Sequence, residues 1–427
     1  MAVINQSIGG GGAKINGIIE QYRVAAGENI SAGEFVQFIH EFGSSTQLYR
    51  KYTTWHTSIR AALLDQNRVL VCHNGGVSTV IKLNGTNITK GADYTNISFG
   101  DTFEVLTTAN DTVLIVYLDS DGYMQGVVVK INDTVVTPGT PTFLSGSSYN
   151  DNKYISICPI GPNRVFVFHT GEGNAFPYGM IITINDSAIT PGTATILSTV
   201  NYSGWYLSAS AINSEKVFVI YGWTSIKAQV ISVAGMTITA GVETNFRNSS
   251  VYAPVGLTLL NENKIFIMYN YTSDGVKLSY LIANINGATI TFEDSKAVSI
   301  ESDRYCGEHF GAFKLENSKI FVWFTSGSQE YYGYPYGLIV VVEGENIILK
   351  APVQLSTMFG MFKRMYAIKA GTNGAFITSS GNNGIEPTYV YGIMDTIAAK
   401  QATPSTIDGI AKTSGTQGEV IGVYVPE

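Results

Sequence analysis

Aromatic side chains in polar, glycine-rich stretches are the residues of this sequence best suited to contact a ligand. A tyrosine or tryptophan ring offers a flat apolar face, and neighbouring Asn, Asp, Ser and Gly supply hydrogen-bond donors and acceptors. That mixture suits sugar rings or a protein surface, since amphipathic rings give contact area at low entropic cost. The alternative for any single ring is burial inside the fold. The candidates are Tyr149, Tyr202, Trp205, Trp223, Tyr252, Tyr271, Tyr305, Tyr331, Tyr332, Tyr334 and Tyr389.

Catalysis finds little support among the charged residues. The histidines are His40, His56, His73, His169 and His309. Two of them, His73 and His169, stand where other copies of an internal repeat carry tyrosine, which indicates a packing role at a strand end. Sialidase chemistry needs three arginines around a carboxylate, but the eight arginines are scattered from Arg23 to Arg364 and no S-x-D-x-G-x-x-W box recurs. We expect no catalytic residues and no enzyme activity.

Metal and cofactor motifs are equally weak. The run from Asp119 to Gly122 (DSDG) resembles the start of a calcium loop but lacks the later ligands and the closing Glu, so we interpret it as a polar turn. Cys72, Cys158 and Cys306 lie far apart without CxxC spacing, which favours buried thiols over a disulfide or a zinc site. We expect no metal and no cofactor.

Charge and hydropathy restrict the partners. The formal net charge is −7, and the lysines and arginines form no basic stripe that could follow a phosphate backbone, so nucleic acid is not expected as a partner. The chain has no run of 18 apolar residues and begins without the pattern of a signal peptide. We therefore expect synthesis in the cytoplasm and no membrane insertion.

One pattern recurs seven times, a polar pair followed by alternating aliphatic and aromatic residues. The copies start at Asn67, Asp111, Asn163, Glu215, Asn263, Ser318 and, in degenerate form, Asn373. Their first aliphatic positions lie 44 to 55 residues apart, a spacing that suits one four-stranded blade. Val, Ile, Thr, Tyr and Phe at period two indicate strands throughout. The sequence predicts an all-β, seven-bladed β-propeller with very little helix.

Strand order within a blade follows from the runs around each copy. A run of small residues such as YISICPI, from Tyr154, precedes the repeat and suits the crowded innermost strand. A second β-rich run follows and is divided by a dipeptide such as Asn132-Asp133 or Asn286-Gly287. Residues that tolerate positive φ at both positions favour a two-residue hairpin there. We expect the small-residue run to be strand one, the repeat strand two, and the divided run strands three and four.

The four-stranded meander sorts the connections onto two rims. Turns between strands one and two and between strands three and four fall on one rim and are short. Connections from strand two to three and from strand four to the next blade fall on the other rim, and they are long and aromatic. All eleven ring candidates belong to that second rim. Long loops on a rigid scaffold commonly carry function, so we expect the second rim to bind a ligand.

The two ends of the chain lie outside the repeats and contain the segments YRVAAGENISAGEFVQFI, from Tyr22, and TIDGIAKTSGTQGEVIGVYVPE, from Thr406. They resemble the "AGE-x-I-x-AGDFV" opening and the "GIAKTSGTAGE-x-I-x-VYVP" ending of structural proteins encoded by phages and prophages of Firmicutes, which include tail, collar and head-decoration proteins. The resemblance implies a component of a virion or phage-tail-like particle, whose repeats are also similar. It implies no catalytic residues.

Each terminal segment is too short to bury a core alone, so we expect the two to form one small β-module into which the propeller is inserted. The predicted division is an arm and half-module at 1–45, the propeller at 46–403 and the second half-module at 404–427. The strand near Thr46 (TQLYRKYTTW) is expected to complete the last blade and remove exposed edges. The polar segment from Met1 to Lys14 suits an arm that orders against a neighbouring subunit. The candidates for docking on a particle are Ile4, Ile8, Tyr22, Ile30, Phe35, Ile410 and Val423.

The expected function is that of a particle-surface adhesin, with the terminal module attached to other virion proteins and the long-loop rim holding a host-surface glycan or protein. The expected location is the surface of a virion or phage-like particle, where the chain forms a homo-oligomer. The alternative is a capsid-decoration or collar protein that contacts virion proteins alone. A propeller glycan hydrolase is the third interpretation.

Overall fold

The computed structural model describes residues 17–24, 29–30, 35–39, 45–49, 58–73, 76–84, 87–95, 97, 99–100, 102–145, 154–170, 176–199, 206–222, 226–247, 256–271, 277–298, 305–315, 319–329, 332–343, 346–349, 352–354, 364–370, 374–380, 388–393, 398–401, 409–411, 415–416 and 420–426. The side chains discussed below lie between residues 58 and 376. Every regular element in these ranges is a β-strand, which confirms the all-β prediction. No helix in the described ranges is long and apolar enough to cross a membrane.

The chain divides into two compact units, Ser45–Gly392 and a terminal unit made of Met1–Ser44 and Ile393–Glu427. In the larger unit, the described strands form seven antiparallel sheets of four or five strands. The first three consist of β5 (Ile59–Asp65), β6 (Arg68–His73), β7 (Val77–Asn84) and β8 (Asn87–Tyr94); β9 (Phe103–Ala109), β10 (Thr112–Leu118), β11 (Met124–Asn132), β12 (Val135–Pro138) and β13 (Thr142–Ser145); and β14 (Ile155–Gly161), β15 (Arg164–Thr170), β16 (Pro177–Asn185), β17 (Ala188–Pro191) and β18 (Thr195–Ile196).

The remaining sheets repeat this plan. They consist of β19 (Tyr206–Asn213), β20 (Lys216–Gly222), β21 (Ile226–Ala234), β22 (Thr237–Ala240) and β23 (Thr244–Arg247); β24 (Gly256–Asn261), β25 (Lys264–Tyr271), β26 (Lys277–Asn286), β27 (Thr289–Phe292) and β28 (Lys296–Ala297); β29 (Tyr305–Lys314), β30 (Lys319–Gln329), β31 (Tyr332–Glu343), β32 (Asn346–Leu349) and β33 (Val353–Gln354); and β34 (Arg364–Ala370), β35 (Gly374–Ser380) and β36 (Thr388–Ile393), joined by β4 (Ser45–Tyr49).

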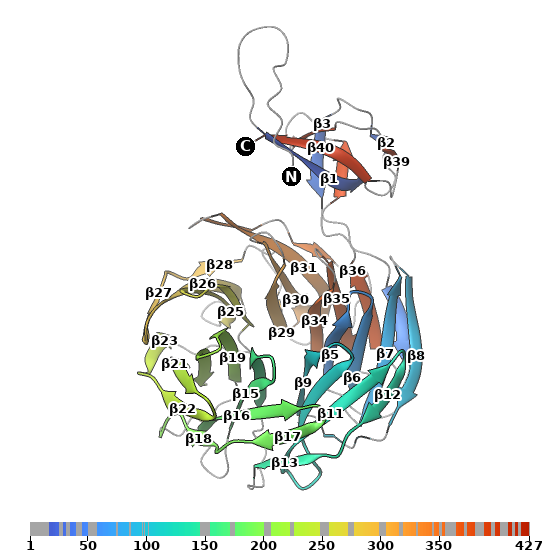
Figure 1. Ribbon diagram of the computed structural model, residues 1–427. Helices are drawn as coiled ribbons and strands as arrows, with labels where there is room; N and C mark the ends of the chain where they lie inside the picture. The colour runs from blue at the N-terminus through green and yellow to red at the C-terminus, as the bar shows by residue number, and fades with distance from the viewer. Residues whose placement is uncertain are drawn as a thin grey trace. The chain divides into compact units, whose positions relative to one another are not determined.

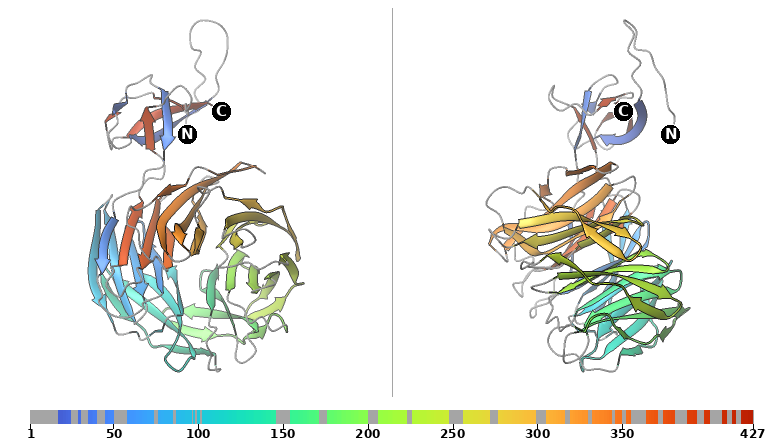
Figure 2. Two further views of the ribbon diagram at one scale, coloured as in Figure 1. Left: turned by 180° about the vertical axis from the view of Figure 1, so that it is seen from behind. Right: turned by 90° about the vertical axis from the view of Figure 1, so that its left-hand side faces the viewer.

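The sheets follow one another around a ring, so the larger unit is a β-propeller (Figure 1). The innermost strands β5, β9, β14, β19, β24, β29 and β34 neighbour one another in turn, and β34 neighbours β5 again. The view from behind shows the same succession (Figure 2). In each sheet the small-residue run is innermost and the repeat copy lies next to it, which confirms the predicted strand order.

Six of the sheets are blades made from one continuous stretch of chain, whereas the last sheet is composite. Its outer strand is β4, which pairs antiparallel with β36 in the register Tyr389↔Gln47 and Val390↔Thr46. This pairing confirms the expectation that the strand near Thr46 completes the last blade. The predicted count of seven blades needs correction: the structure has six blades made from one continuous stretch of chain, and the seventh predicted blade corresponds to the composite sheet.

The outer strand is divided in five blades, a feature that the sequence analysis did not predict. Two short pieces, such as β17 and β18, pair with one long third strand, here β16. Between the pieces the Gly192 amide donates to the Ile181 carbonyl over 2.8 Å, and a Cβ on Gly192 would lie 2.8 Å from that oxygen. At the equivalent Gly241 the Val230 oxygen would lie 2.4 Å away, so glycine permits the close approach.

The hairpins between strands three and four differ from the prediction by one residue. Asn132 pairs with Val135 and Asn286 with Thr289, so the loop starts at the second member of each dipeptide. Only that second residue has positive φ, 56° at Asp133 and 63° at Gly287. The predicted positive φ at both dipeptide positions is wrong, because the first residue still belongs to the ladder.

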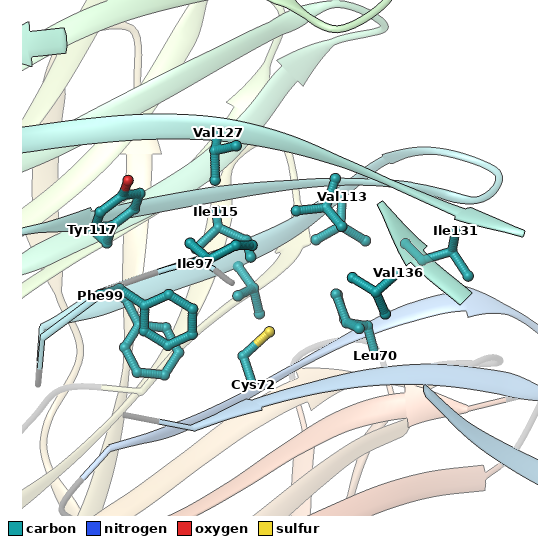
Figure 3. Close-up of a cluster of buried hydrophobic side chains, with 14 of the residues drawn as sticks. Leu70, Cys72, Ile97, Phe99, Val113, Ile115, Tyr117, Val127, Ile131 and Val136 are labelled. Atoms are coloured by element: carbon teal, nitrogen blue, oxygen red, sulfur yellow. The ribbon is translucent and has the colours of Figure 1, made fainter. Parts of the chain in front are cut away.

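The core consists of apolar layers between neighbouring blades. Between the first two blades, Leu70 and Cys72 face Val113, Ile115 and other buried side chains (Figure 3). Alternate residues of a strand point to opposite faces, so the aliphatic and aromatic residues of one repeat copy fill the layers on both sides. This packing gives the ring a rigid interior.

The terminal unit is a closed barrel with the order β1-β37-β3-β38-β40, beside the two-stranded sheet β2-β39. The strands are β1 (Gly17–Val24), β2 (Asn29–Ile30), β3 (Phe35–Ile39), β37 (Ala398–Gln401), β38 (Gly409–Ala411), β39 (Gly415–Thr416) and β40 (Val420–Pro426). The two chain ends therefore share one β-module. Its boundary needs correction, because β37 pairs with β1 and β3, whereas the predicted propeller extended to residue 403.

Candidate ligand-binding rim

The strand topology gives the propeller two different rims. The tight-turn rim carries the connections between strands one and two and between strands three and four. The long-loop rim carries the connections from strand two to three and from strand four to the next blade. We call the strand halves next to each rim the tight-turn half and the long-loop half.

Ion pairs and hydrogen bonds connect neighbouring blades at the tight-turn rim. On the first blade, the Arg68 guanidinium lies 2.6 Å from a carboxylate oxygen of Asp65 in its own turn and 2.5 Å from one of Asp111 in the next blade. Its Nη1 donates to the Asp133 carbonyl over 3.1 Å. The hydrogen bonds to Asp65 and Asp111 raise the pKa of Arg68. Burial opposes ionisation of Asp65, but the hydrogen bonds from the Asn67 backbone amide and from Arg68 lower its pKa. Arg68 therefore ties its own turn to two turns of the neighbouring blade.

The same connection recurs further round the ring. Arg164, at the repeat position of Arg68, donates to the carbonyl oxygens of Ser214 and Gly235 in the next blade, over 3.2 Å in each case. Lys82 pairs with Asp133 over 2.7 Å, and Lys130 pairs with Asp186 over 2.5 Å. These charged groups of the tight-turn rim therefore contact neighbouring blades.

The long-loop half differs in what it buries. Every buried polar side chain of the described residues lies in the long-loop half of its strand or directly beside that half. We call this set the polar floor. It consists of Ser58, Ser78, Thr79, His169, Thr170, Ser198, Gln229, Thr258, Asn270, Ser279, Thr325 and Ser326.

Polar atoms without a partner are costly to bury, so the polar floor requires partners. Some are visible: the Gln229 amide nitrogen donates to the Leu197 carbonyl of the neighbouring blade over 3.2 Å. The hydroxyl oxygens of Thr325 and Ser326 have no partner among the described residues, and neither does Oε1 of Gln229. Buried oxygens without a protein partner are expected where loops, water or a polar ligand supply the missing hydrogen bonds.

His169 is the titratable member of the polar floor. Its ring is 2% exposed, stacks on Tyr178 at 5.6 Å, and its Nδ1 lies 3.2 Å from the Thr170 carbonyl oxygen. Burial lowers the pKa of His169 to about 4. The equivalent Tyr221 and Tyr269 are also buried, which confirms the predicted packing role for His169.

The aromatic candidates fall into two groups. The side chains of all eleven lie outside the described residues. The backbone is described for Tyr271, Tyr305, Tyr332, Tyr334 and Tyr389. The remaining six, whose backbone also lies outside the described residues, are Tyr149, Tyr202, Trp205, Trp223, Tyr252 and Tyr331.

Four of the placed residues stand where the topology predicted them. Tyr271 ends β25, Tyr305 begins β29, and Tyr332 and Tyr334 lie at the start of β31, which are all strand ends at the long-loop rim. Tyr389 lies second in β36, at the same kind of strand start. The topology thus brings these backbone positions to one rim, as expected.

The stretch from Ser326 to Gly337, interpreted as a loop, is largely a β-hairpin. β30 continues five residues past Phe324, to Gln329, whereas β15 and β20 end one residue past the equivalent position. The register shifts between Ser326 and Gln329, which pair with Tyr334 and Tyr332. Tyr336, two residues after Tyr334, is 8% exposed and stacks on Phe324 at 5.7 Å, so it belongs to the core.

The remaining predicted features are structural. Asp119 accepts backbone hydrogen bonds from Asp121 and Tyr123 over 3.0 and 2.8 Å, so the DSDG run is the polar turn that we expected. Cys72 and Cys158 are buried, and burial raises the pKa of both thiols, that of Cys158 to about 12. No group of three potential metal ligands occurs within the described residues. Cys306 lies in β29, with its side chain outside the described residues.

Among the docking candidates, Ile4 and Ile8 lie outside the described residues. The backbones of the others lie in strands of the terminal unit. The register pairs Tyr22 with Ile421, Ile30 with Gly415, Phe35 with Ile410 and Ala411 with Val423. These positions come together in one unit, although nothing in the structure assigns them a partner.

Sequence reasoning missed the polar floor. Most of its members are short Ser and Thr residues, for which the sequence alone does not distinguish a buried hydroxyl from one in a turn. A signal was nevertheless present, since the residue after the conserved-looking aromatic position of each repeat is Thr170, Asn270 or Thr325 in three copies.

The sequence matches no protein-family model and none of the curated proteins with which it was compared. Solved structures are similar in fold. The BP39L lectin from Burkholderia pseudomallei has a TM-score of 0.61 at 13% identity, over 81% of this chain and 98% of the lectin. The β-propeller domain of Cps50 (Swd1) from Myceliophteria thermophila has a TM-score of 0.52 at 8% identity, over 82% of this chain and 100% of that domain. Identities this low show the propeller fold and nothing further.

Proposed function

We propose that this chain is a surface protein of a phage or phage-like particle that binds a cell-surface glycan through its long-loop rim. The terminal unit attaches to other virion proteins, and the propeller, with the composite sheet as its seventh blade, presents the rim. The observation that carries the proposal is the polar floor, because polar groups are buried beneath this rim alone among the described residues.

The glycan part of the proposal rests on complementarity. Sugar hydroxyls donate and accept hydrogen bonds as Ser, Thr and Asn side chains do, and sugar rings have apolar faces that stack on tyrosine and tryptophan. The rim sequences supply the rings and the floor supplies polar support. Similarity in fold to a propeller called a lectin agrees with this class of ligand.

The particle part rests on the terminal motifs. Their resemblance to structural proteins of Firmicutes phages and prophages supports a virion location, and a separate terminal unit suits attachment. A capsid-decoration or collar role is the second candidate, since the same motifs support it. A propeller glycan hydrolase is the third candidate.

A binding experiment on the whole chain tests the glycan proposal. Purified protein is incubated with host cells and with host cell-wall polysaccharide, and retention is compared for wild type and a variant with Tyr331→Ala, Tyr332→Ala and Tyr334→Ala. We expect retention to fall at least about tenfold, since interface aromatics carry a large share of binding energy. The matched control carries Val135→Ser, 62% exposed at the start of β12, and Val242→Ser, 74% exposed between β22 and β23.

The outcomes separate the candidates. Normal folding with lost retention in the triple variant alone supports an adhesin. Absence of any retention by wild type, with antibody labelling of the shell or collar of intact particles, supports the decoration role instead. Retention that the triple variant leaves unchanged contradicts the assignment to these tyrosines.

A further inference from the structure

Two stretches of chain pair twice, once in each unit. In the terminal barrel β3 pairs antiparallel with β37, with Ile39 opposite Ala398. In the propeller the same stretches continue as β4 and β36, which pair antiparallel with Ser45 opposite Tyr391. Five residues, 40–44, join β3 to β4, and four, 394–397, join β36 to β37. Both connections between the units therefore start at the strand pair that completes the composite sheet.

That strand pair is also the seam of the ring. Each blade is joined to the next by the continuing chain, but β36 and β4 lie at opposite ends of the propeller sequence and meet only by pairing. To open the ring, β36 must separate from β4. The composite sheet must also leave the first blade, where Phe376 packs against Ile59 and Ala61.

Arg60 reinforces the inner side of the seam. Its guanidinium carbon lies 5.2 Å from the ring centre of Tyr366 on β34, and its Nη2 lies 2.8 Å from an oxygen of Glu104 on β9. Arg60 thus contacts the composite sheet and the second blade at once. At the same register, four inner strands away from the seam carry only small residues, namely Ser156, Ser208, Gly256 and Gly311.

We propose that the terminal barrel is the clasp of the propeller ring. When β3 and β37 are paired, the adjoining ends of β4 and β36 are tethered by two short connections. Without that pairing, the two strands are tethered only through the rest of the propeller. Because the cost of closing a loop grows with its length, the clasp raises the effective concentration of one strand near the other by about a hundredfold.

The clasp also makes the ring responsive to what binds the barrel. A partner that stabilises the barrel stabilises β4–β36 pairing by thermodynamic linkage, and one that opens the barrel loosens the seam. This coupling holds whichever ligand the rim binds. It assigns the terminal unit a role in the integrity of the propeller as well as in attachment.

Hydrogen exchange of the full chain tests the clasp. Ile421→Pro puts a residue without an amide donor into β40, opposite Tyr22 of β1, and changes no residue of β4 or β36. We expect exchange in residues 45–49 and 388–393 to accelerate at least about tenfold, and exchange in β20 to stay within about twofold of wild type. Ile421→Val is the matched control and is expected to leave all three rates unchanged.

Rapid exchange of the barrel strands with wild-type rates in β4 and β36 would overturn the clasp. If Ile421→Pro leaves the barrel protected, a second variant that ends at Asp408 removes β38, β39 and β40. In that variant, fast exchange of β1 together with wild-type protection of β4 and β36 overturns the proposal. Joint loss of protection in β1, β4 and β36, with β20 still protected, supports it.

Discussion

The two halves of the propeller are built from the same repeat but bury different chemistry. In the tight-turn half the described interior is apolar, and the polar groups of the rim pair with neighbouring blades, as Arg68 does with Asp111 and Lys130 with Asp186. In the long-loop half the strand ends bury hydroxyl, amide and imidazole groups. The described charged groups of the tight-turn rim are thus paired across blades, whereas the long-loop half buries polar side chains, of which the Thr325 and Ser326 hydroxyls have no partner among the described residues.

This difference shows how one repeat can supply both an apolar core and a polar region at the opposite strand ends. Apolar packing between the blades and short turns stabilise the ring, so the strand ends at the long-loop rim can differ in sequence. Those ends are then available for residues that would be costly elsewhere, provided that loops, water or a ligand complete their hydrogen bonds. The comparison predicts unequal effects for similar substitutions in the two halves.

The largest contrast is expected from removing aromatic rings. Phe218 is fully buried among the apolar layers, so Phe218→Ala should lower the free energy of unfolding by about 4 kcal/mol. Tyr332→Ala with Tyr334→Ala, at the long-loop rim, should change it by no more than about 0.5 kcal/mol. Urea denaturation followed by fluorescence measures both. Equal losses would remove the distinction between the halves.

Exchange of a methyl group for a hydroxyl is the next test. Val217 is fully buried in the tight-turn half, and Val217→Thr should cost about 2 kcal/mol because the new hydroxyl has only apolar neighbours. The reverse change, Thr325→Val, removes a hydroxyl of the polar floor and should alter the free energy of unfolding by less than about 1 kcal/mol. If Thr325→Val proves the more damaging, the long-loop half is the more tightly satisfied one.

Lowering the pH should destabilise the protein through His169, the titratable member of the polar floor. Because burial lowers the pKa of His169 to about 4, the unfolded chain takes up this proton first, near its ordinary value of about 6.5. Stability from this group is therefore complete above pH 6.5 and falls by about 1.4 kcal/mol per pH unit as the pH drops towards 4. His169→Tyr introduces the residue found at equivalent positions and should remove this component. Urea midpoints of both proteins between pH 4.5 and 7.5 provide the comparison, and parallel curves would contradict it.

The smallest effect is expected at the exposed ion pairs. Lys130 and Asp186 have side chains that are 49% and 73% exposed, so Lys130→Met should cost no more than about 0.5 kcal/mol. The loss should shrink further in 1 M salt, where the charges are screened. A cost near 2 kcal/mol would show that single pairs, rather than apolar layers, hold the tight-turn rim.

Much of the fold could be predicted because the repeat has a clear period. Strand two was predicted from alternating residues such as those from Arg164 to Thr170, and strand one from the small residues that begin at Ile155. The division of the outer strand at Gly192 was not predictable, since a close backbone approach depends on a carbonyl in another strand. The strand β37 was assigned to the wrong unit because its partners, β1 and β3, lie more than three hundred residues earlier.

The candidate site was predicted only in outline. Connectivity alone placed Tyr271, Tyr305 and Tyr332 at one rim, because a meander fixes which strand ends meet. Burial of Tyr336 beside Phe324 was not predictable, since the register of the β30–β31 hairpin decides which of its tyrosines enters the core. The polar floor escaped prediction because burial of a Ser or Thr depends on neighbours from other blades.

The central claim, that the long-loop rim binds and the tight-turn rim supports, is tested most directly by hydrogen exchange with and without host cell-wall polysaccharide. We predict slower exchange on addition of polysaccharide in peptides that contain the β30–β31 hairpin and the ends of β15 and β25. Peptides across the tight turns at Asp133 and Asp186 should show no change. Slower exchange confined to those tight turns would contradict the account.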